Sequence, residues 1–165
     1  MLLWDLEMVT ERQLLGELTP QERLEVGVAA LAWTLETLAE PIETVEIRDY
    51  LARGVGVAQR SVSRRAIQAE LPPEMVEQFD EIDGVADEPG TSHFLAALMA
   101  CHDVDSGLDQ ERISGVLSYC YEGSLDREGL AEWSPDVERR NQRCLDVIQF
   151  QKSLIRHVMN SSPSR

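Results

Sequence analysis

The stretch TPQERLEVGVAALAWTLETL, residues 19–38, carries the clearest structural signal in the chain. It opens with Thr19, Pro20 and Glu22, the residue types favoured at an N-cap, at the first helical position and in a capping box. Apolar residues then recur at intervals of three or four, which places them on one side of a helix; they are Leu24, Val28, Leu31, Leu35 and Leu38. We therefore expect an amphipathic helix that begins at Pro20 and stops before Pro41.

The same apolar spacing extends through nearly all of the chain, and no segment shows the alternation typical of a strand. Turn and capping residues predict further helices at 2–16, 41–54, 57–70, 73–82, 94–101 and 109–121, with a last helix opened by Ser134-Pro135. In this interpretation, Gly54 and Gly56 separate two helices. Thr91 or Ser92 caps the helix that starts near Phe94, and Asp109 caps the following one.

These elements predict an all-α fold, a single-domain bundle of about seven or eight helices over residues 1–160, with a disordered tail at 161–165. Cys101, Cys120 and Cys144 have no metal-binding spacing, so we expect three small buried residues. The apolar N-terminal residues are soon interrupted by acids, and no apolar run approaches the roughly 18 residues of a membrane span. The sequence therefore predicts a cytoplasmic protein.

The net charge of −15 is distributed unevenly along the chain. Residues 66–111 contain twelve acids and neither lysine nor arginine. The densest run consists of Glu70, Glu74, Glu77, Asp80, Glu81, Asp83, Asp87 and Glu88. Such a run repels nucleic-acid phosphates and opposes folding, which favours a surface that binds a basic protein partner. The alternative is that the acidity only keeps the protein soluble.

Other charged and aromatic residues extend this interpretation. The turn that follows His102 adds three acids to the predicted partner-binding surface, namely Asp103, Asp105 and Asp109. Trp4 and Trp133 lie near the ends of predicted helices and are candidate exposed anchors, whereas Trp33 is expected in the core. The arginines that precede the acidic run are expected to pair with carboxylates of neighbouring helices rather than to bind phosphate; they include Arg53, Arg60 and Arg64.

The sequence offers little support for catalytic or metal chemistry. His93 and His102 are nine residues apart, so on one helix they would face opposite sides. The turn around Asp105 resembles part of a calcium loop, but Leu108 replaces the required glycine and Ser114 the required glutamate. No nucleophile elbow or glycine-rich phosphate loop is present. We therefore expect no enzymatic activity, metal or cofactor.

Three segments carry a resemblance to known proteins: ERLEVGVAALAWTLETL (22–38), HFLAALMACHD (93–103) and ERRNQRCLDVIQFQKSLI (138–155). In their order and lengths they resemble the small, acidic, all-helical immunity proteins that bacteria make against toxins, and they are similar to a YjaG-like helical family. This resemblance implies an inhibitor that binds a toxin domain and blocks its active site or its access to substrate. It implies no particular functional residue.

The leading hypothesis is thus a non-catalytic immunity or inhibitor protein that binds a basic, nuclease-type toxin through residues 70–88 and the turn at 103–111. The first alternative is a helical regulatory or scaffold subunit of a bacterial complex, held by an apolar surface. The second alternative is a metal-dependent hydrolase that uses His93, His102 and neighbouring carboxylates.

Overall fold

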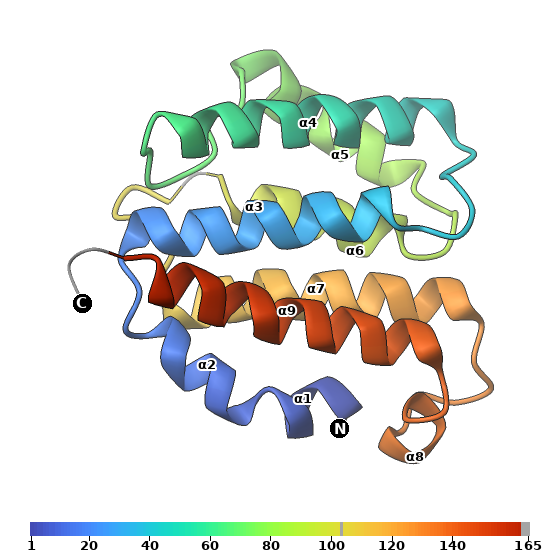
Figure 1. Ribbon diagram of the computed structural model, residues 1–165. Helices are drawn as coiled ribbons and strands as arrows, with labels where there is room; N and C mark the ends of the chain where they lie inside the picture. The colour runs from blue at the N-terminus through green and yellow to red at the C-terminus, as the bar shows by residue number, and fades with distance from the viewer. Residues whose placement is uncertain (103, 163–165) are drawn as a thin grey trace.

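The computed structural model describes residues 1–102 and 104–162, and all regular elements in these residues are α-helices (Figure 1). Residue 103 and part of the predicted tail, residues 163–165, lie outside the described residues. The helices are α1 (Leu3–Glu7), α2 (Val9–Leu15), α3 (Pro20–Glu36), α4 (Val45–Ser63), α5 (Pro73–Gly84), α6 (Thr91–Ala100), α7 (Gln110–Glu128), α8 (Pro135–Glu138) and α9 (Gln142–Asn160). The all-α prediction is confirmed, although the described residues form nine helices, more than predicted.

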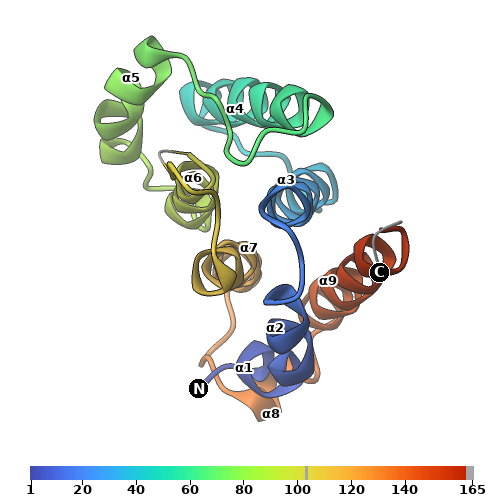
Figure 2. The ribbon, with the colours of Figure 1, turned by 90° about the vertical axis from the view of Figure 1, so that its left-hand side faces the viewer.

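Helix α3 occupies the middle of the molecule and packs against α4, α6, α7 and α9 (Figures 1 and 2). Helix α5 lies at the outer edge, against α4, while α1, α2 and α8 gather at the opposite end in the view of Figure 2. Buried side chains from these layers form one hydrophobic cluster. No helix in the described part of the chain is both long and apolar enough to cross a membrane.

The predicted start of α3 is confirmed in detail. The Thr19 hydroxyl accepts a hydrogen bond from the Glu22 amide at 3.2 Å, and the Glu22 carboxylate accepts one from the Thr19 amide at 2.9 Å. This capping box satisfies two backbone donors that have no partner inside the helix. Val26 and Ala30 are also fully buried, because α3 is covered on more than one side.

The predicted break at Gly54 and Gly56 is wrong, because α4 continues without interruption from Val45 to Ser63. Gly54 is buried where α4 meets α6, and a β-carbon at this position would overlap the side chain of Leu98. The glycine therefore permits a close approach of two helices rather than ending one. The ends of the two predicted helices, 41–44 and 64–70, lie outside helices.

Several predicted helix boundaries also differ. The helix predicted at 2–16 is divided at Met8 into α1 and α2. Ser134-Pro135 opens only the short α8, and α9 starts separately with Asn141 as its N-cap. Gly90, in the left-handed region with φ 82°, takes the N-cap position of α6 that was predicted for Thr91 or Ser92.

The extra boundary between α8 and α9 follows from a buried side chain. Glu138 is fully buried at the end of α8, where its Oε1 atom accepts hydrogen bonds from the Tyr121 hydroxyl at 2.6 Å and from the Leu3 amide at 3.0 Å. This contact joins α1, α7 and α8 at one point. Helix α8 is thereby held against the N-terminal segment, and α9 begins again after a turn.

The burial of the cysteines and tryptophans can be compared with the predictions for the core. All three cysteines are buried and free, as expected, and burial raises the pKa of the Cys101 and Cys120 thiols to about 12. The prediction that Trp4 is an exposed anchor is wrong, because its side chain is buried and its indole donates to Gln151 Oε1 at 2.7 Å. Trp33 is half-buried and stacks on Phe150 with ring centroids 4.2 Å apart.

Candidate functional site

Helix α5 carries most of the acidic run, and its sequence explains why the acids face outward. Pro72 and Pro73 start the helix, and Met75 is its one fully buried residue, with Phe79 and Ile82 packed partly against the core. These three apolar residues are spaced by four and three positions, so they form a single inner stripe. The opposite side exposes Glu74, Glu77, Asp80, Glu81 and Asp83. We call these five carboxylates the α5 acidic face; α5 itself is seen at the upper left of Figure 2.

One arginine compensates part of this charge. Arg53 on α4 donates to Glu74 at 2.8 Å, which confirms the predicted pairing for Arg53. The pKa of Glu74 is lowered by its own backbone amide and by this guanidinium. Among the described residues, Arg60 and Arg64 form no ion pair, so the predicted pairing is not found there.

The other four carboxylates of the α5 acidic face, those of Glu77, Asp80, Glu81 and Asp83, form no hydrogen bond or ion pair within the described part of the chain. Two of them, Glu81 and Asp83, occupy the last turn of the helix, which has no basic residue. The carbonyl end of a helix carries partial negative charge, so acids at this position are locally unfavourable. Apart from Glu74, the face is therefore an exposed negative surface that the described part of the fold does not neutralise.

Glu88 belongs to the predicted surface by sequence but has a structural role. Its carboxylate accepts hydrogen bonds from the Thr44 amide at 3.0 Å, from the Glu43 amide at 2.9 Å and from the Arg127 guanidinium at 2.9 Å. Arg127 also donates to the Glu40 carbonyl at 2.9 Å. The carboxylate thus joins the α3–α4 connection to α7 and is only 16% exposed. Glu88 is therefore removed from the predicted partner-binding surface.

The charged partners of Glu88 determine its ionisation. Burial disfavours the carboxylate, but the Arg127 guanidinium and the donors of Thr44 and Glu43 outweigh this effect. The pKa of Glu88 is therefore held below its ordinary value. The neighbouring Asp87 remains exposed and carries no such contact among the described residues.

The acids after α6 lie near Glu70, the first residue of the acidic run. The Ala69 amide donates to the Cys101 carbonyl at 2.7 Å, and the Val104 amide donates to Gln68 at 2.9 Å, so the turn after α6 is adjacent to the segment that contains Glu70. Glu70 and Asp105 are exposed there. Asp109 is the N-cap of α7, as predicted, because its Oδ1 accepts from the Arg112 amide at 2.7 Å. Asp103 lies outside the described residues.

Trp133 lies apart from α5, in the connection between α7 and α8, and is 41% exposed. Its ring centroid is 6.4 Å from that of His93 in the first turn of α6. The structure thus brings Trp133 close to His93. The two residues are 40 positions apart in the sequence, so sequence spacing could not predict this contact. His102 instead contacts the Ala69 carbonyl through Nδ1 at 2.9 Å, so the two histidines have different neighbours.

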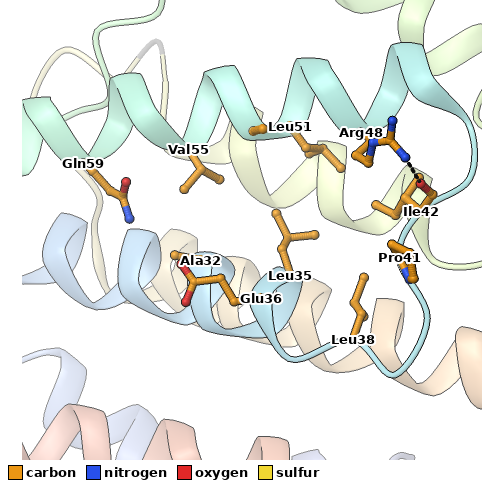
Figure 3. A pocket seen from close by; sticks show the side chains of 11 residues that line it. Ala32, Leu35, Glu36, Leu38, Pro41, Ile42, Arg48, Leu51, Val55 and Gln59 are labelled. Carbon is orange, nitrogen blue, oxygen red and sulfur yellow. Dashed lines mark hydrogen bonds between the residues drawn. The ribbon is translucent and has the colours of Figure 1, made fainter.

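A second surface feature was missed by sequence reasoning. A groove of about 360 Å³ lies between α3 and α4, and apolar side chains from both helices and their connection point into it (Figure 3); they include Leu35, Leu38, Ile42, Leu51 and Val55. Arg48 lies at one end, where its guanidinium contacts the Ile42 carbonyl at 3.4 Å. The apolar stripe predicted for α3 contained a signal for this groove. Leu38 belongs to that stripe by its spacing, but it lies after Glu36, the last residue of α3, and lines the groove instead.

The described residues contain no group of three or more histidine, cysteine or acidic side chains arranged to hold a metal ion. No family model, curated protein or solved structure matches the chain.

Proposed function

We propose that this chain is a non-catalytic, cytoplasmic immunity or inhibitor protein that binds a basic, nuclease-type bacterial toxin domain. The binding surface consists of the α5 acidic face, with Glu70, Asp87 and Asp105 at its ends. One observation carries the proposal: four exposed carboxylates of one outer helix have no positive partner among the described residues. A basic protein supplies the missing countercharge, and its nucleic-acid site is the surface most complementary to a row of acids.

Exposed apolar residues beside the acidic face support a protein partner rather than free cations. Val76 is 38% exposed on α5, and Val85, which follows the helix, is 48% exposed. A stable protein interface combines apolar contacts at its centre with charges around them. Here the valines would supply the contact area, while the carboxylates would accelerate encounter with the toxin and fix its orientation.

The proposal is tested with purified, catalytically inactivated toxin nuclease domains of high isoelectric point. We expect at least one to bind with an association rate that falls about tenfold or more between 50 and 300 mM NaCl, because salt screens the attraction. Neutralising the four unpaired acids (Glu77→Gln, Asp80→Asn, Glu81→Gln, Asp83→Asn) should weaken binding by about tenfold or more. Surface plasmon resonance measures both effects.

A charge-matched control separates the acidic face from net charge. Glu25→Gln, Glu36→Gln, Glu132→Gln and Asp146→Asn remove the same number of charges from exposed positions on α3, on the α7–α8 connection and on α9. This variant should change affinity by less than about threefold. Equal losses in the two variants, or binding that is insensitive to salt, would contradict a role for the α5 acidic face.

The α3–α4 groove favours a second candidate, a helical regulatory or scaffold subunit. Its apolar lining is suited to an amphipathic helix of another subunit. This candidate predicts association that persists at high salt and that the four-acid variant leaves unchanged. The same binding measurements therefore distinguish the two functions.

A further inference from the structure

A second surface, remote in sequence from the acidic run, surrounds Glu122 on α7. Glu122 is half-buried, yet within the described part of the chain its carboxylate accepts no hydrogen bond and forms no ion pair. Its titratable neighbours are His93 and Asp5. Burial raises the pKa of Glu122, His93 opposes this shift and Asp5 reinforces it. The carboxylate is thus partly removed from water and forms no ion pair in the described part of the chain. A cation from a binding partner would supply the missing countercharge.

Two exposed aromatic side chains lie on the same surface. Tyr119 precedes Glu122 by one helical turn, so both project from the same side of α7, and Tyr119 is 38% exposed. Trp133 is 41% exposed, and its ring lies 6.4 Å from that of His93. His93 and Glu122 directly precede Phe94 and Gly123, the residues through which α6 and α7 touch, so both lie at the same contact between the two helices. The Nδ1 atom of His93 is buried and has no hydrogen-bond partner among the described residues. The surface therefore combines one carboxylate with two aromatic faces.

This combination matches the chemistry of one side chain, arginine. A guanidinium is planar, stacks on aromatic rings and donates paired hydrogen bonds to a carboxylate, whereas the ammonium of lysine is a compact, strongly hydrated charge. A second copy of this chain is a poor occupant, because two molecules that each carry −15 repel one another. A basic partner is attracted by the same field.

We infer that the surface formed by Tyr119, Glu122 and Trp133 binds an arginine side chain of the basic partner, with the guanidinium paired to the Glu122 carboxylate and stacked on Trp133. The inference rests on the proposed function, since it names a residue type on the toxin. It adds a contact that selects one residue type to the electrostatic attraction of the α5 acidic face. Tyr and Trp are also the residue types that most often dominate binding energy at protein interfaces.

The test compares octa-arginine with octa-lysine peptides as probes of the intact protein. We expect octa-arginine to bind about tenfold more tightly, because only the guanidinium can both stack and pair. In NMR titrations the indole N–H of Trp133 should shift with octa-arginine and much less with octa-lysine. Glu122→Gln and Trp133→Leu should each bring the affinity ratio close to one while changing octa-lysine binding by less than about threefold.

Two controls make the result decisive. Glu111→Gln, an exposed carboxylate at the start of the same helix, should leave the arginine preference intact. The four-acid variant of α5 should weaken both peptides equally and keep their ratio. Absence of an arginine preference, or a preference that survives either Glu122→Gln or Trp133→Leu, overturns the inference and leaves the proposed function standing. Failure of every toxin domain to bind, with the arginine preference intact, overturns the proposed function instead.

Discussion

At the scale of single residues, neighbouring acids of one run have different roles. Asp87 and Glu88 are adjacent and both belong to the densest acidic stretch, but Asp87 is exposed whereas Glu88 binds Arg127 and two backbone amides. The Glu88 carboxylate is largely shielded from water, so its contacts are screened less than those of a surface pair. Glu88 is therefore a stabilising residue, and only Asp87 is available to a partner.

Glu88→Gln should lower the free energy of unfolding at pH 7 by about 1–2 kcal/mol, because the amide replaces a charged acceptor of several hydrogen bonds. The lowered pKa fixes the pH dependence. The contribution of the carboxylate is present above its unfolded-state pKa near 4.5 and is lost as pH falls through the lower folded-state pKa. Urea unfolding at a series of pH values should show the difference between wild type and variant shrinking below about pH 4.5.

The adjacent acid provides the control for this measurement. Asp87→Asn should alter stability by less than about 0.5 kcal/mol at any of these pH values, because the side chain is exposed and unpaired in the described part of the chain. If the two variants behaved alike, the contact between Glu88 and Arg127 would not stabilise the fold.

At the scale of helices, close packing against α6 decides where glycine is needed. Gly54 on α4 meets Leu98, and Gly123 on α7 meets the ring of Phe94, so two helices approach α6 through glycines. Phe94 is fully buried and its rigid ring cannot move aside as an exposed chain end could. Helix α7 contains a second glycine, Gly115, at which an added β-carbon would meet no atom within 4 Å.

Gly123→Ala should destabilise the protein by about 1–3 kcal/mol, because the methyl group overpacks the contact between α6 and α7. Gly115→Ala on the same helix should instead stabilise it by about 0.5–1 kcal/mol, because alanine favours the helix and has free space. Chemical denaturation of both variants measures the difference. Stabilisation by Gly123→Ala would show that the helices pack less closely at this point.

At the scale of the whole molecule, the charge distribution opposes stability. The net charge of −15 repels itself, and the last turn of α5 places acids at the negative end of a helix. Most of the arginines in the described residues are used inside the fold, as in the contacts of Arg23 with the Leu15 and Gly16 carbonyls and of Arg143 with the Thr34 carbonyl. Four carboxylates of the α5 acidic face are thus left without a counterion in the described part of the chain.

The four-acid variant should therefore melt at a higher temperature than wild type, by about 3 °C in 10 mM NaCl. The gain should shrink to near zero above about 0.5 M NaCl, because salt screens the repulsion that the substitutions remove. Calorimetric scans at both salt concentrations provide the measurement. The charge-matched control should gain less, since its acids are spread over several elements. A lower melting temperature at low salt would mean that these carboxylates stabilise the fold.

The sequence alone determined the helical class, the capping box of α3, the N-cap of α7 and the buried cysteines. These features depend on residues within one or two helical turns of each other, so apolar spacing and cap chemistry are sufficient to predict them. Thr19 with Glu22 and Asp109 with Arg112 are examples in which donor and acceptor are three residues apart.

The tertiary structure decided everything that depends on contacts between distant segments. It kept α4 whole through Gly54, buried Trp4 against Gln151, withdrew Glu88 from the acidic surface and placed His93 beside Trp133. Each of these outcomes is set by a neighbour at least 39 residues away, as for Glu88 and Arg127. Patterns of residue spacing within one helix do not predict such distant neighbours. The acidic run was visible in the sequence; which of its carboxylates remain free to bind was not.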